Sequence, residues 1–330
     1  MLKIGSVIDG KYKILNAIGH GGMSNVYLAI NEKANKPWAV KEVRKSVSRD
    51  FDLMRQSLIM ETDLLKKLSH PNLPSIIDVI DSDENFLIVM DYIEGNTLER
   101  LLAEEGAQPQ EQVADWALQL CDVLDYLHTR PVPVIYRDMK PSNIMLKSDG
   151  RVVLIDFGTA REFKEKNVAD TVCLGTKGYA APEQFGGMGQ TDARTDIYCL
   201  GTTLYHLVTG HNPAEPPYEI CPITRWNEQL STGLARIIAK CTRQNPDERY
   251  QTAGELRYDL AHYHDLETEA QRRYRGRLGL FGAAAALSLL CAAGGMGFSA
   301  AAGKEQGDAY RDFIQMAEMS PDSDAACRLY

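Results

Sequence analysis

Cysteine is scarce in this sequence, and its spacing argues against two kinds of site. The 330 residues hold seven cysteines, no two of which form a CxxC pair, and no cluster of histidine and cysteine has ligand spacing. Neither a zinc site nor a disulfide framework is therefore expected. Cysteines without a disulfide pattern are typical of reduced compartments, so we expect a cytoplasmic main domain.

Positive charge is also in short supply, with 36 lysines and arginines against 45 aspartates and glutamates and a formal net charge of -9. Nucleic acid binds a basic face, so we do not expect it as a partner. The N-terminus lacks the continuous apolar stretch of a signal peptide, because Asp9 and Lys11 follow residues 1–5 closely. Hydrophobic residues nevertheless make up 44% of the chain, which favours one bilobal domain or two small ones.

The hydrophobic pattern changes character along the chain. Short apolar or alternating runs at 12–18, 26–30 and 38–43 are typical of antiparallel strands, and a helical pattern at 48–68 precedes two more strand-like runs, 76–80 and 86–90. After Gly95, apolar residues recur at helical spacing, as in 113–127 and 197–208. We expect an α+β, bilobal fold, with a small β-rich lobe containing one long helix, joined near 92–95 to a larger helical lobe across a cleft.

A glycine-rich turn at 19–26 is the first candidate for phosphate binding. Its backbone can approach phosphate oxygens closely, although a turn of this kind can also be a simple tight hairpin. Lys41 follows in the apolar strand Trp38-Ala39-Val40, and an inward ammonium needs a partner. Glu61, on the next helical stretch, is available to hold Lys41 against the α- and β-phosphates, whereas a snorkelling surface lysine is the alternative.

A second cluster of polar residues lies between apolar segments of the helical half. The stretch 136–143 carries four functional side chains, and Asp156-Phe157-Gly158 stands directly behind the apolar strand 152–155. The Asp156 carboxylate would emerge beside Asn143, and two hard oxygen ligands suit Mg²⁺ bound to substrate phosphates. A lone Asp-Phe-Gly can be only a turn, but here the pattern predicts a site for metal-bound nucleotide.

With these motifs in this order, residues 11–264 resemble the eukaryotic-like serine/threonine protein kinases, including the bacterial membrane-receptor branch. The resemblance implies ATP and Mg²⁺, with Mn²⁺ as a substitute, and protein substrates with Ser or Thr acceptors. Asp138 becomes the catalytic base, Lys140 neutralises the γ-phosphate, and Asn143 and Asp156 hold the metal. The implied ATP-binding residues, with Met90 as gatekeeper and 91–92 at the hinge, are Ile18, Gly19, His20, Gly21, Gly22, Met23, Ser24, Asn25, Val26, Ala39, Lys41, Glu61, Met90, Asp91 and Tyr92.

The resemblance extends to 175–183, which is similar to the family's peptide-binding segment with its Ala-Pro-Glu anchor and is usually missing from small-molecule kinases. It implies that Glu183 pairs with Arg249 and that Asp196 braces the backbone of the catalytic loop. Two positions depart from the family pattern: Tyr136 replaces the usual histidine and Ser24 replaces the third glycine. Neither departure removes a catalytic group.

Regulation is predicted at the residue before the catalytic base. Arg137 is expected to be a buried or half-buried cation that needs an anionic partner. A phosphate on Thr171 supplies the charge and the acceptors that suit a guanidinium, so we expect autophosphorylation of Thr171 in trans. Thr176 resembles the family threonine that contacts the catalytic Asp and Lys, and is assigned chiefly to substrate positioning. An unmodified, solvent-exposed Thr171 is the alternative.

The composition changes after Asp265. A basic juxtamembrane segment at 265–277 leads into 26 uncharged residues, 278–303, long enough for a tilted transmembrane helix through the lipid bilayer. The preceding arginines favour a single-pass cell-membrane protein with a cytoplasmic kinase domain. A buried or disordered Ala/Gly linker is the alternative. Residues 304–330 would be extracytoplasmic, either as a disordered tail or as the start of a longer helical region.

The predicted organisation is thus a protein kinase domain at 1–264, with an N-lobe at about 1–93 and a C-lobe at about 95–264, followed by the three C-terminal segments. A pseudokinase that binds nucleotide or partners without phosphoryl transfer is the main rival. The polar groups that transfer requires are all present, which favours an active protein kinase. They are Lys41, Glu61, Asp138, Lys140, Asn143 and Asp156.

Overall fold

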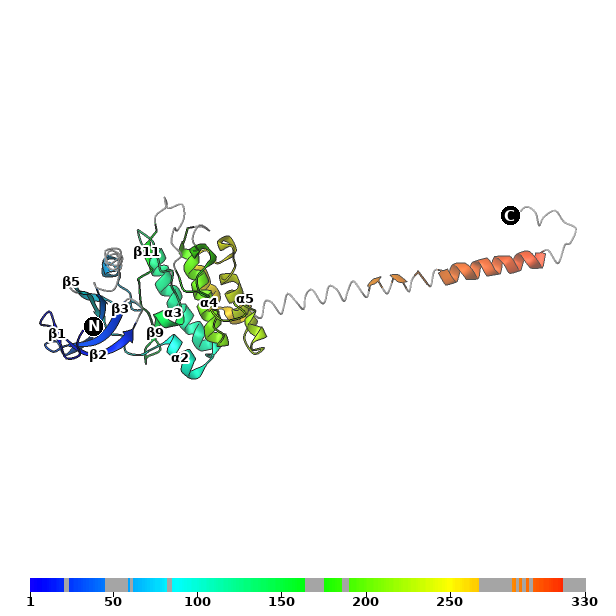
Figure 1. The fold of residues 1–330 in the computed structure, drawn as a ribbon. Helices are drawn as coiled ribbons and strands as arrows, with labels where there is room; N and C mark the ends of the chain where they lie inside the picture. The colour runs from blue at the N-terminus through cyan, green and yellow to red at the C-terminus, as the bar shows by residue number, and fades with distance from the viewer. Residues whose placement is uncertain are drawn as a thin grey trace. The chain divides into compact units, whose positions relative to one another are not determined.

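The computed structural model of the protein describes residues 1–20, 24–44, 59, 62–81, 85–163, 175–185, 190–266, 287–288, 291–292, 295–296 and 299–316. The chain separates into two compact units, Met1–Glu267 and Thr268–Tyr330. Within the first unit, a β-sheet lies at one end and a group of helices packs together at the other (Figure 1). This unit has the bilobal arrangement that the sequence predicts.

An antiparallel six-stranded sheet forms the small lobe, in the order β1-β2-β3-β4-β6-β5. The strands are β1 (Val7–Ile8), β2 (Tyr12–His20), β3 (Ser24–Asn31), β4 (Lys36–Arg44), β5 (Ile76–Asp81) and β6 (Asn85–Asp91). The five strands predicted from sequence are confirmed, and each is somewhat longer than its apolar run. The two-residue β1 is an addition, because a strand that short carries no readable alternation.

Alternation along β4 gives its two faces different roles. Trp38 and Val40 are buried on one face, in a small core with Tyr12, Ile14, Tyr27, Ala29, Leu87 and Val89. Ala39 and Lys41 point to the opposite face, because successive side chains of a strand alternate. The strand register places Lys41 opposite Val26 of β3 and Ile88 of β6. Strand pairing therefore brings Lys41 beside the end of the glycine-rich turn.

The large lobe is helical, and its apolar stripes are buried as the sequence predicts. Its elements are α2 (Leu98–Glu105), α3 (Gln110–His128), α4 (Ala193–Thr209), α5 (Thr232–Cys241) and α6 (Ala253–Ala261), with short 3-10 turns η1 (Pro141–Asn143), η2 (Pro182–Gln184), η3 (Ile223–Arg225) and η4 (Pro246–Glu248). The stripe of α3 lies in the main core, where the side chains of Val113, Ala117, Leu120, Leu124 and Leu127 have no exposed area. Helix α4 crosses the same core.

Two small sheets position the loops between the lobes. Strands β7 (Asn96–Thr97), β9 (Ile144–Leu146) and β10 (Val152–Leu154) form one, and β8 (Val134–Ile135) pairs with β11 (Arg161–Glu162) in the other. Together they fix both ends of the loops at 136–143 and 155–160. Gly95 at the lobe junction has φ 147°, and a Cβ there would lie 2.0 Å from the Leu146 carbonyl oxygen, so only glycine fits this close approach.

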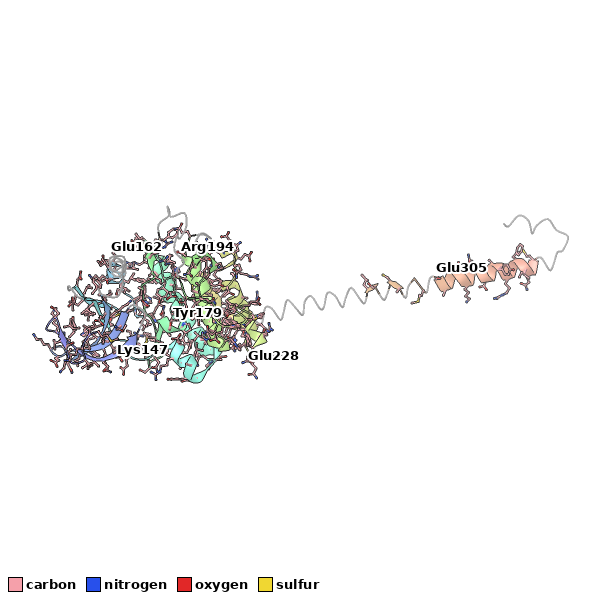
Figure 2. All side chains as sticks on the ribbon, viewed as in Figure 1. Lys147, Glu162, Tyr179, Arg194, Glu228 and Glu305 are labelled. Atoms are coloured by element: carbon pink, nitrogen blue, oxygen red, sulfur yellow. The ribbon has the colours of Figure 1, made fainter. Side chains whose placement is uncertain are left out.

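Two further helical segments are described in part or in full. Residue 59 and residues 62–66 belong to the helix predicted at 48–68, the rest of which lies outside the described residues. Residues 299–316 form a helix in the second unit, which carries Glu305 (Figure 2). Of the predicted membrane segment 278–303, most lies outside the described residues. In the ranges that the structure describes, no helix is both long and apolar enough to cross a bilayer.

Candidate active site

The Asp138 carboxylate lies at the centre of a bonded group of side chains. The Asn143 amide donates from Nδ2 to Asp138 Oδ2 at 2.9 Å and to the Asp138 carbonyl at 2.9 Å. The Lys140 ammonium lies 2.9 Å from the same Oδ2. Because β8 and β9 hold the two ends of this loop, the side chains of Asn143 and Lys140 both reach the Asp138 carboxylate.

The second oxygen of Asp138 contacts the peptide-binding segment. Thr176 donates its hydroxyl to Asp138 Oδ1 at 2.7 Å, and the Lys140 ammonium donates to Thr176 Oγ1 at 2.5 Å. A tight turn holds the backbone of Thr176, because the amides of Tyr179 and Ala180 both donate to its carbonyl oxygen. A hydroxyl is thus held between the predicted base and the predicted cation, which is the kind of contact that a substrate Ser or Thr would make.

Asp196, in the first turn of α4, holds the backbone of the catalytic loop by hydrogen bonds. Its side chain is fully buried and accepts the backbone amides of Tyr136 at 2.9 Å and Arg137 at 2.7 Å. Its Oδ2 also lies 2.8 Å from His128 Nε2, so His128 at the end of α3 is a hydrogen-bonding partner in the interior. Asp196 thus joins the first turn of α4 and the end of α3 to the backbone of the catalytic loop.

Arg137 has a left-handed backbone that buried partners hold in place. Its φ is 69°, an unfavourable value for a side chain of this size. Asp196 binds its amide, and Gln184 donates Nε2 to its carbonyl at 2.7 Å. The side chain is buried, and its Nε donates to the Thr159 carbonyl at 2.7 Å. Arg137 is therefore a buried cation, as expected, and Thr171 lies outside the described residues.

Tyr136 fills the place where the family pattern has histidine. Its ring is fully buried and packs edge-on against Phe157, with centroids 5.1 Å apart. Its hydroxyl donates to the Ile155 carbonyl at 2.5 Å. Burial raises the pKa of the phenol well above its ordinary value, and the carboxylates of Asp156 and Asp138 add to the shift. Tyr136 thus remains a neutral donor that ties the catalytic loop to the segment before Asp156.

Asp156 contacts Lys41 of the small lobe. Its φ is 65°, and its Oδ1 lies 3.1 Å from the Lys41 ammonium. Loss of hydration opposes ionisation of Asp156, but the Lys41 ammonium, the Gly158 amide and the Lys140 ammonium together outweigh it, so the pKa lies below its ordinary value. The sequence paired Lys41 with Glu61, which lies outside the described residues. The structure adds a contact between Lys41 and Asp156 across the two lobes.

The predicted metal ligands lie next to each other. The Ile155 amide donates to the Asn143 carbonyl at 2.8 Å, which sets Asp156 beside Asn143. Asn143 uses its Nδ2 as a donor to Asp138, so its amide oxygen stays available. One carboxylate and one amide oxygen fit Mg²⁺, which takes few protein ligands together with phosphate oxygens. No group of three or more His, Cys, Asp or Glu in the described ranges could hold a metal ion alone.

Of the predicted nucleotide pocket, the structure describes the residues of β4, β6 and the hinge. Ala39 of β4 pairs in register with Met90 of β6, and Asp91 pairs with Trp38. The Asp91 carboxylate accepts the Ser75 amide at 3.0 Å, so this side chain fixes the start of the hinge while Tyr92 is half-buried. Ile18 is exposed, and Asn25 and Val26 lie in β3. Gly19 and the backbones of His20 and Ser24 are in strands, whereas Gly21, Gly22 and Met23 lie outside the described residues.

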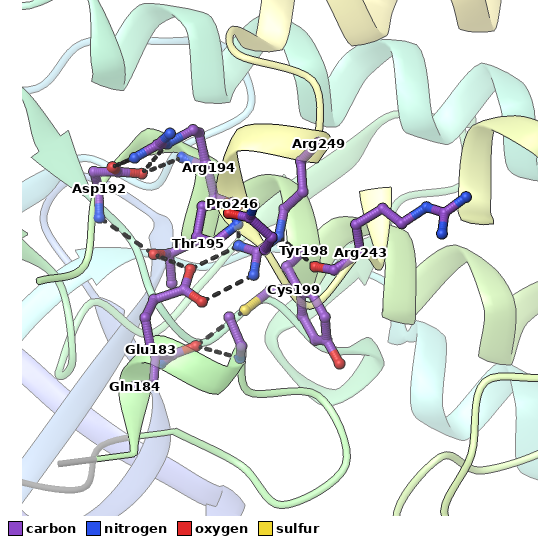
Figure 3. A network of polar contacts seen from close by, with 12 residues as sticks. Glu183, Gln184, Asp192, Arg194, Thr195, Tyr198, Cys199, Arg243, Pro246 and Arg249 are labelled. Carbon is purple, nitrogen blue, oxygen red and sulfur yellow. Dashed lines mark hydrogen bonds and ion pairs between the residues drawn. The ribbon is translucent and has the colours of Figure 1, made fainter. Parts of the chain in front are cut away.

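Glu183 and Arg249 form a buried bidentate pair (Figure 3). The two guanidinium nitrogens donate to the two carboxylate oxygens at 2.7 and 2.9 Å. Arg249 also donates to the carbonyls of Arg194, Arg243 and Gln244, and Glu183 accepts the Thr195 hydroxyl at 2.8 Å. This network joins η2, the start of α4 and the segment around η4. It anchors the end of the peptide-binding segment.

Gln184 is a positioning residue that sequence reasoning missed. It is buried, and its amide joins the catalytic loop at Arg137 to the Ala181 amide, whose nitrogen donates to Gln184 Oε1 at 2.9 Å. The only sequence signal is its place after Glu183. A glutamine is usually exposed, so nothing in the pattern marks this one as interior.

Comparison with known proteins agrees with the geometry. The protein kinase domain family matches residues 12–259. A probable serine/threonine-protein kinase of Clostridium perfringens is 34% identical over 269 residues, which cover 78% of this chain and 39% of that relative. The serine/threonine-protein kinases PrkC of Bacillus subtilis and PknB of Mycobacterium leprae are each 31% identical, over 82% and 78% of this chain and 43% of their own length.

The chain thus spans about two fifths of the length of these curated relatives. The matched region includes the strand that carries Lys41, the catalytic loop and the segment that ends at Glu183. A family match over residues 12–259, on a two-lobed fold whose catalytic loop is bonded as described, shows that this chain belongs to the protein kinase family.

Proposed function

We propose that the chain is a serine/threonine protein kinase that transfers the γ-phosphate of ATP to hydroxyl groups of proteins. The observation that carries this proposal is the Thr176 hydroxyl, held between Asp138 and Lys140 at hydrogen-bond distance from both. The relatives named as serine/threonine kinases support the same residue specificity.

The chain's own groups divide the reaction between them. The substrate hydroxyl oxygen attacks the γ-phosphorus, the bond from that phosphorus to the bridging oxygen of ADP breaks, and Asp138 accepts the hydroxyl proton. Lys140 lies 2.9 Å from Asp138 and places its positive charge where the transferred group is most negative. Lys41 reaches the same region from the small lobe and positions the donor phosphates.

Asn143 and Asp156 would hold Mg²⁺, since one supplies an amide oxygen and the other a carboxylate. Bound there, the ion neutralises charge on the β- and γ-phosphates. Asp156 suits this role because its pKa is below the ordinary value, so the carboxylate is ionised at neutral pH. The Lys41 ammonium that lowers this pKa is itself expected to turn toward phosphate when nucleotide is present.

Control of activity is proposed at Thr171. Arg137 is a buried cation directly before Asp138, and Gln184 ties its carbonyl to the end of the peptide-binding segment. A phosphate on Thr171 that pairs with Arg137 would order this segment. The test is mass spectrometry of the autophosphorylated protein beside the kinetics of Thr171→Ala. An unmodified Thr171, or a variant as active as the parent, would refute the switch.

Membrane attachment is proposed for 278–303. What supports it is the run of 26 uncharged residues behind four arginines, at 272, 273, 275 and 277. The kinase unit would then be cytoplasmic and concentrated in the plane of the membrane, which favours reaction between two copies. Dimerisation and the lipid bilayer as a partner are part of this proposal.

The deciding experiment is transfer of labelled phosphate from ATP to the protein itself and to a generic basic substrate. Asp138→Asn should abolish transfer, and Lys41→Met and Asp156→Asn should each reduce it at least about a hundredfold with the fold intact. A parent chain that binds ATP but transfers no phosphate would instead support the pseudokinase alternative. Parent rates in any of the three variants would overturn the assignment of the site.

A further inference from the structure

Glu42 is a buried carboxylate with no part in the chemistry proposed above. It follows Lys41 in β4, and its side chain has no exposed area. Glutamate is almost never fully buried without a function or a strong partner, because removal of its charge from water is costly. Among the described residues, Glu42 forms an ion pair with the N-terminal ammonium of Met1, and no lysine or arginine pairs with it. The neighbouring groups must therefore stabilise the buried carboxylate.

The carboxylate binds β3 at two positions. Glu42 Oε2 accepts the Tyr27 hydroxyl at 2.8 Å and the Asn25 amide at 3.4 Å. Asn25 and Tyr27 are two residues apart, so they share one face of β3 and lie on either side of Val26. The side chains of Glu42, Asn25 and Tyr27 are buried, whereas Val26 is half-buried. One carboxylate thus fixes β3 on both sides of Val26, one of the residues that the family resemblance assigns to ATP.

The register shows why this clamp matters for nucleotide. Asn25 pairs with Glu42, and the next pair is Val26 with Lys41. The clamp therefore lies on the back of the strand pair whose front carries Lys41 and Val26. Residues 21–23 of the glycine-rich turn immediately precede β3 in the sequence. A small rotation of β3 about its axis would move both the turn and Val26 relative to Lys41.

The N-terminal residues cover the same carboxylate. The Leu2 amide lies 3.2 Å from the Tyr27 hydroxyl and 3.4 Å from Glu42 Oε2, and the Met1 amino nitrogen lies 3.5 Å from Oε1. Leu2 also packs against the small core of the sheet. These contacts close the clamp from solvent, so its hydrogen bonds are made in a region of low dielectric, where they are strong.

We propose that Glu42 is a positioning residue for ATP: through Tyr27 and Asn25 it fixes β3, and with it the glycine-rich turn, at the correct place opposite Lys41. This inference rests on the proposed kinase function. It predicts that a loss of the clamp weakens ATP binding while the catalytic loop, which lies in the other lobe, keeps its geometry.

The test measures the KM for ATP, kcat and, independently, the Kd for ATP by calorimetry. Tyr27→Phe removes only the hydroxyl and should raise KM and Kd about threefold to tenfold, with kcat within about twofold. Glu42→Leu should have a larger effect of the same kind. Glu42→Gln keeps an acceptor oxygen for Tyr27 and should restore most of the affinity. Glu32→Gln is the matched control, since Glu32 is exposed and pairs with Lys13 near the other end of β3.

Thermal unfolding is measured for each variant. If Glu42→Leu fails to fold, the ATP affinity of Tyr27→Phe still tests the proposal. Folded variants with the ATP Kd of the parent would overturn the proposal, as would an equal loss in kcat with KM unchanged. A parent that binds ATP without phosphoryl transfer would refute the kinase function, whereas the Kd comparison would still test the clamp.

Discussion

Thr176 joins the segment at 175–183 to the catalytic loop. Its hydroxyl donates to Asp138 and accepts from Lys140, so it links the base to the cation and fixes their separation. A residue that only packed would not need a hydroxyl at this point. Under the proposed function a substrate hydroxyl would have to reach the same region, so Thr176 would help to position the acceptor.

The prediction at this scale is a kinetic one. Thr176→Ala removes the link and should lower kcat about tenfold to a hundredfold, because a shift of the reacting groups by about 1 Å is that costly. Thr176→Ser keeps the hydroxyl and should retain most of the activity. Both are measured as initial rates on a peptide, at a phosphorylation state matched by mass spectrometry. Equal rates for the alanine and serine variants would contradict a role for the hydroxyl.

Sequence reasoning reached the charged residues of this site because phosphoryl transfer demands their chemistry at fixed spacing. Asp138, Lys140 and Asn143 stand within six residues, and Asp196 fits a family motif. Gln184 and Glu42 were not predicted, because their importance comes from burial, which a polar residue in isolation does not reveal. The contact of Lys41 with Asp156 was also missed, since it depends on how the two lobes face each other.

At the scale of elements, α4 is the platform on which the active site is built. It supplies Asp196 to the catalytic loop, and Thr195 and the Arg194 carbonyl to the buried pair of Glu183 and Arg249. Figure 2 labels Arg194 at the start of this helix. The helices at 113–127 and 197–208 and the long strands were predictable from apolar periodicity, whereas α2, α5 and α6 were not predicted individually. The two-residue strands that hold the loops could not be predicted, because pairing partners distant in sequence define them.

Loss of the buried ion pair should destabilise this platform. Glu183→Gln leaves the Arg249 guanidinium without its charge partner in the interior, which costs about 3 kcal/mol. For a domain of this size, the melting temperature should fall by about 6–12 °C. Glu104→Gln is the control, because Glu104 pairs with Arg100 on the exposed surface of α2 and should cost less than about 0.5 kcal/mol. Equal shifts in the two variants would show that burial of the pair is unimportant.

His206 near the end of α4 should make stability depend on pH. Its Nδ1 lies 2.6 Å from the Tyr179 hydroxyl, and burial, with His211 nearby, lowers its pKa to about 4 from an ordinary 6.5. Below pH 6.5 the unfolded chain binds a proton at His206, whereas the folded chain does not bind it until the pH approaches 4. The free energy of unfolding therefore falls as the pH drops from 6.5 to 4 and is constant below pH 4.

The measurement is denaturant unfolding at pH 7, 6 and 5. The parent should lose about 1 kcal/mol more than His206→Gln between pH 7 and pH 5, after allowance for partial exposure of the ring. The comparison concerns the change with pH, so a general destabilisation by the substitution does not affect it. Parallel curves for the two proteins would show that His206 does not carry the dependence.

At the scale of the whole molecule, the question is where the kinase unit lies relative to a membrane. Under the proposed membrane attachment, the four arginines at 272–277 and the uncharged run at 278–303 would put residues 1–264 in the cytoplasm and residues 304–330 outside. The described helix at 299–316 carries Lys304 and Arg311, and Arg311 is largely exposed, so trypsin has sites on this side. Trypsin added to intact cells should therefore remove the C-terminal segment and leave the kinase unit whole.

Antibodies against the two ends of the chain read the outcome on a blot. In permeabilised cells the kinase unit should also be cut, which shows that its own sites are accessible and that the membrane was the barrier. Cleavage within residues 1–264 in intact cells would reverse the proposed orientation. An intact chain under the external protease, with both ends cut after permeabilisation, would show that 278–303 does not span the membrane, and the Ala/Gly linker would then be the correct interpretation of that segment.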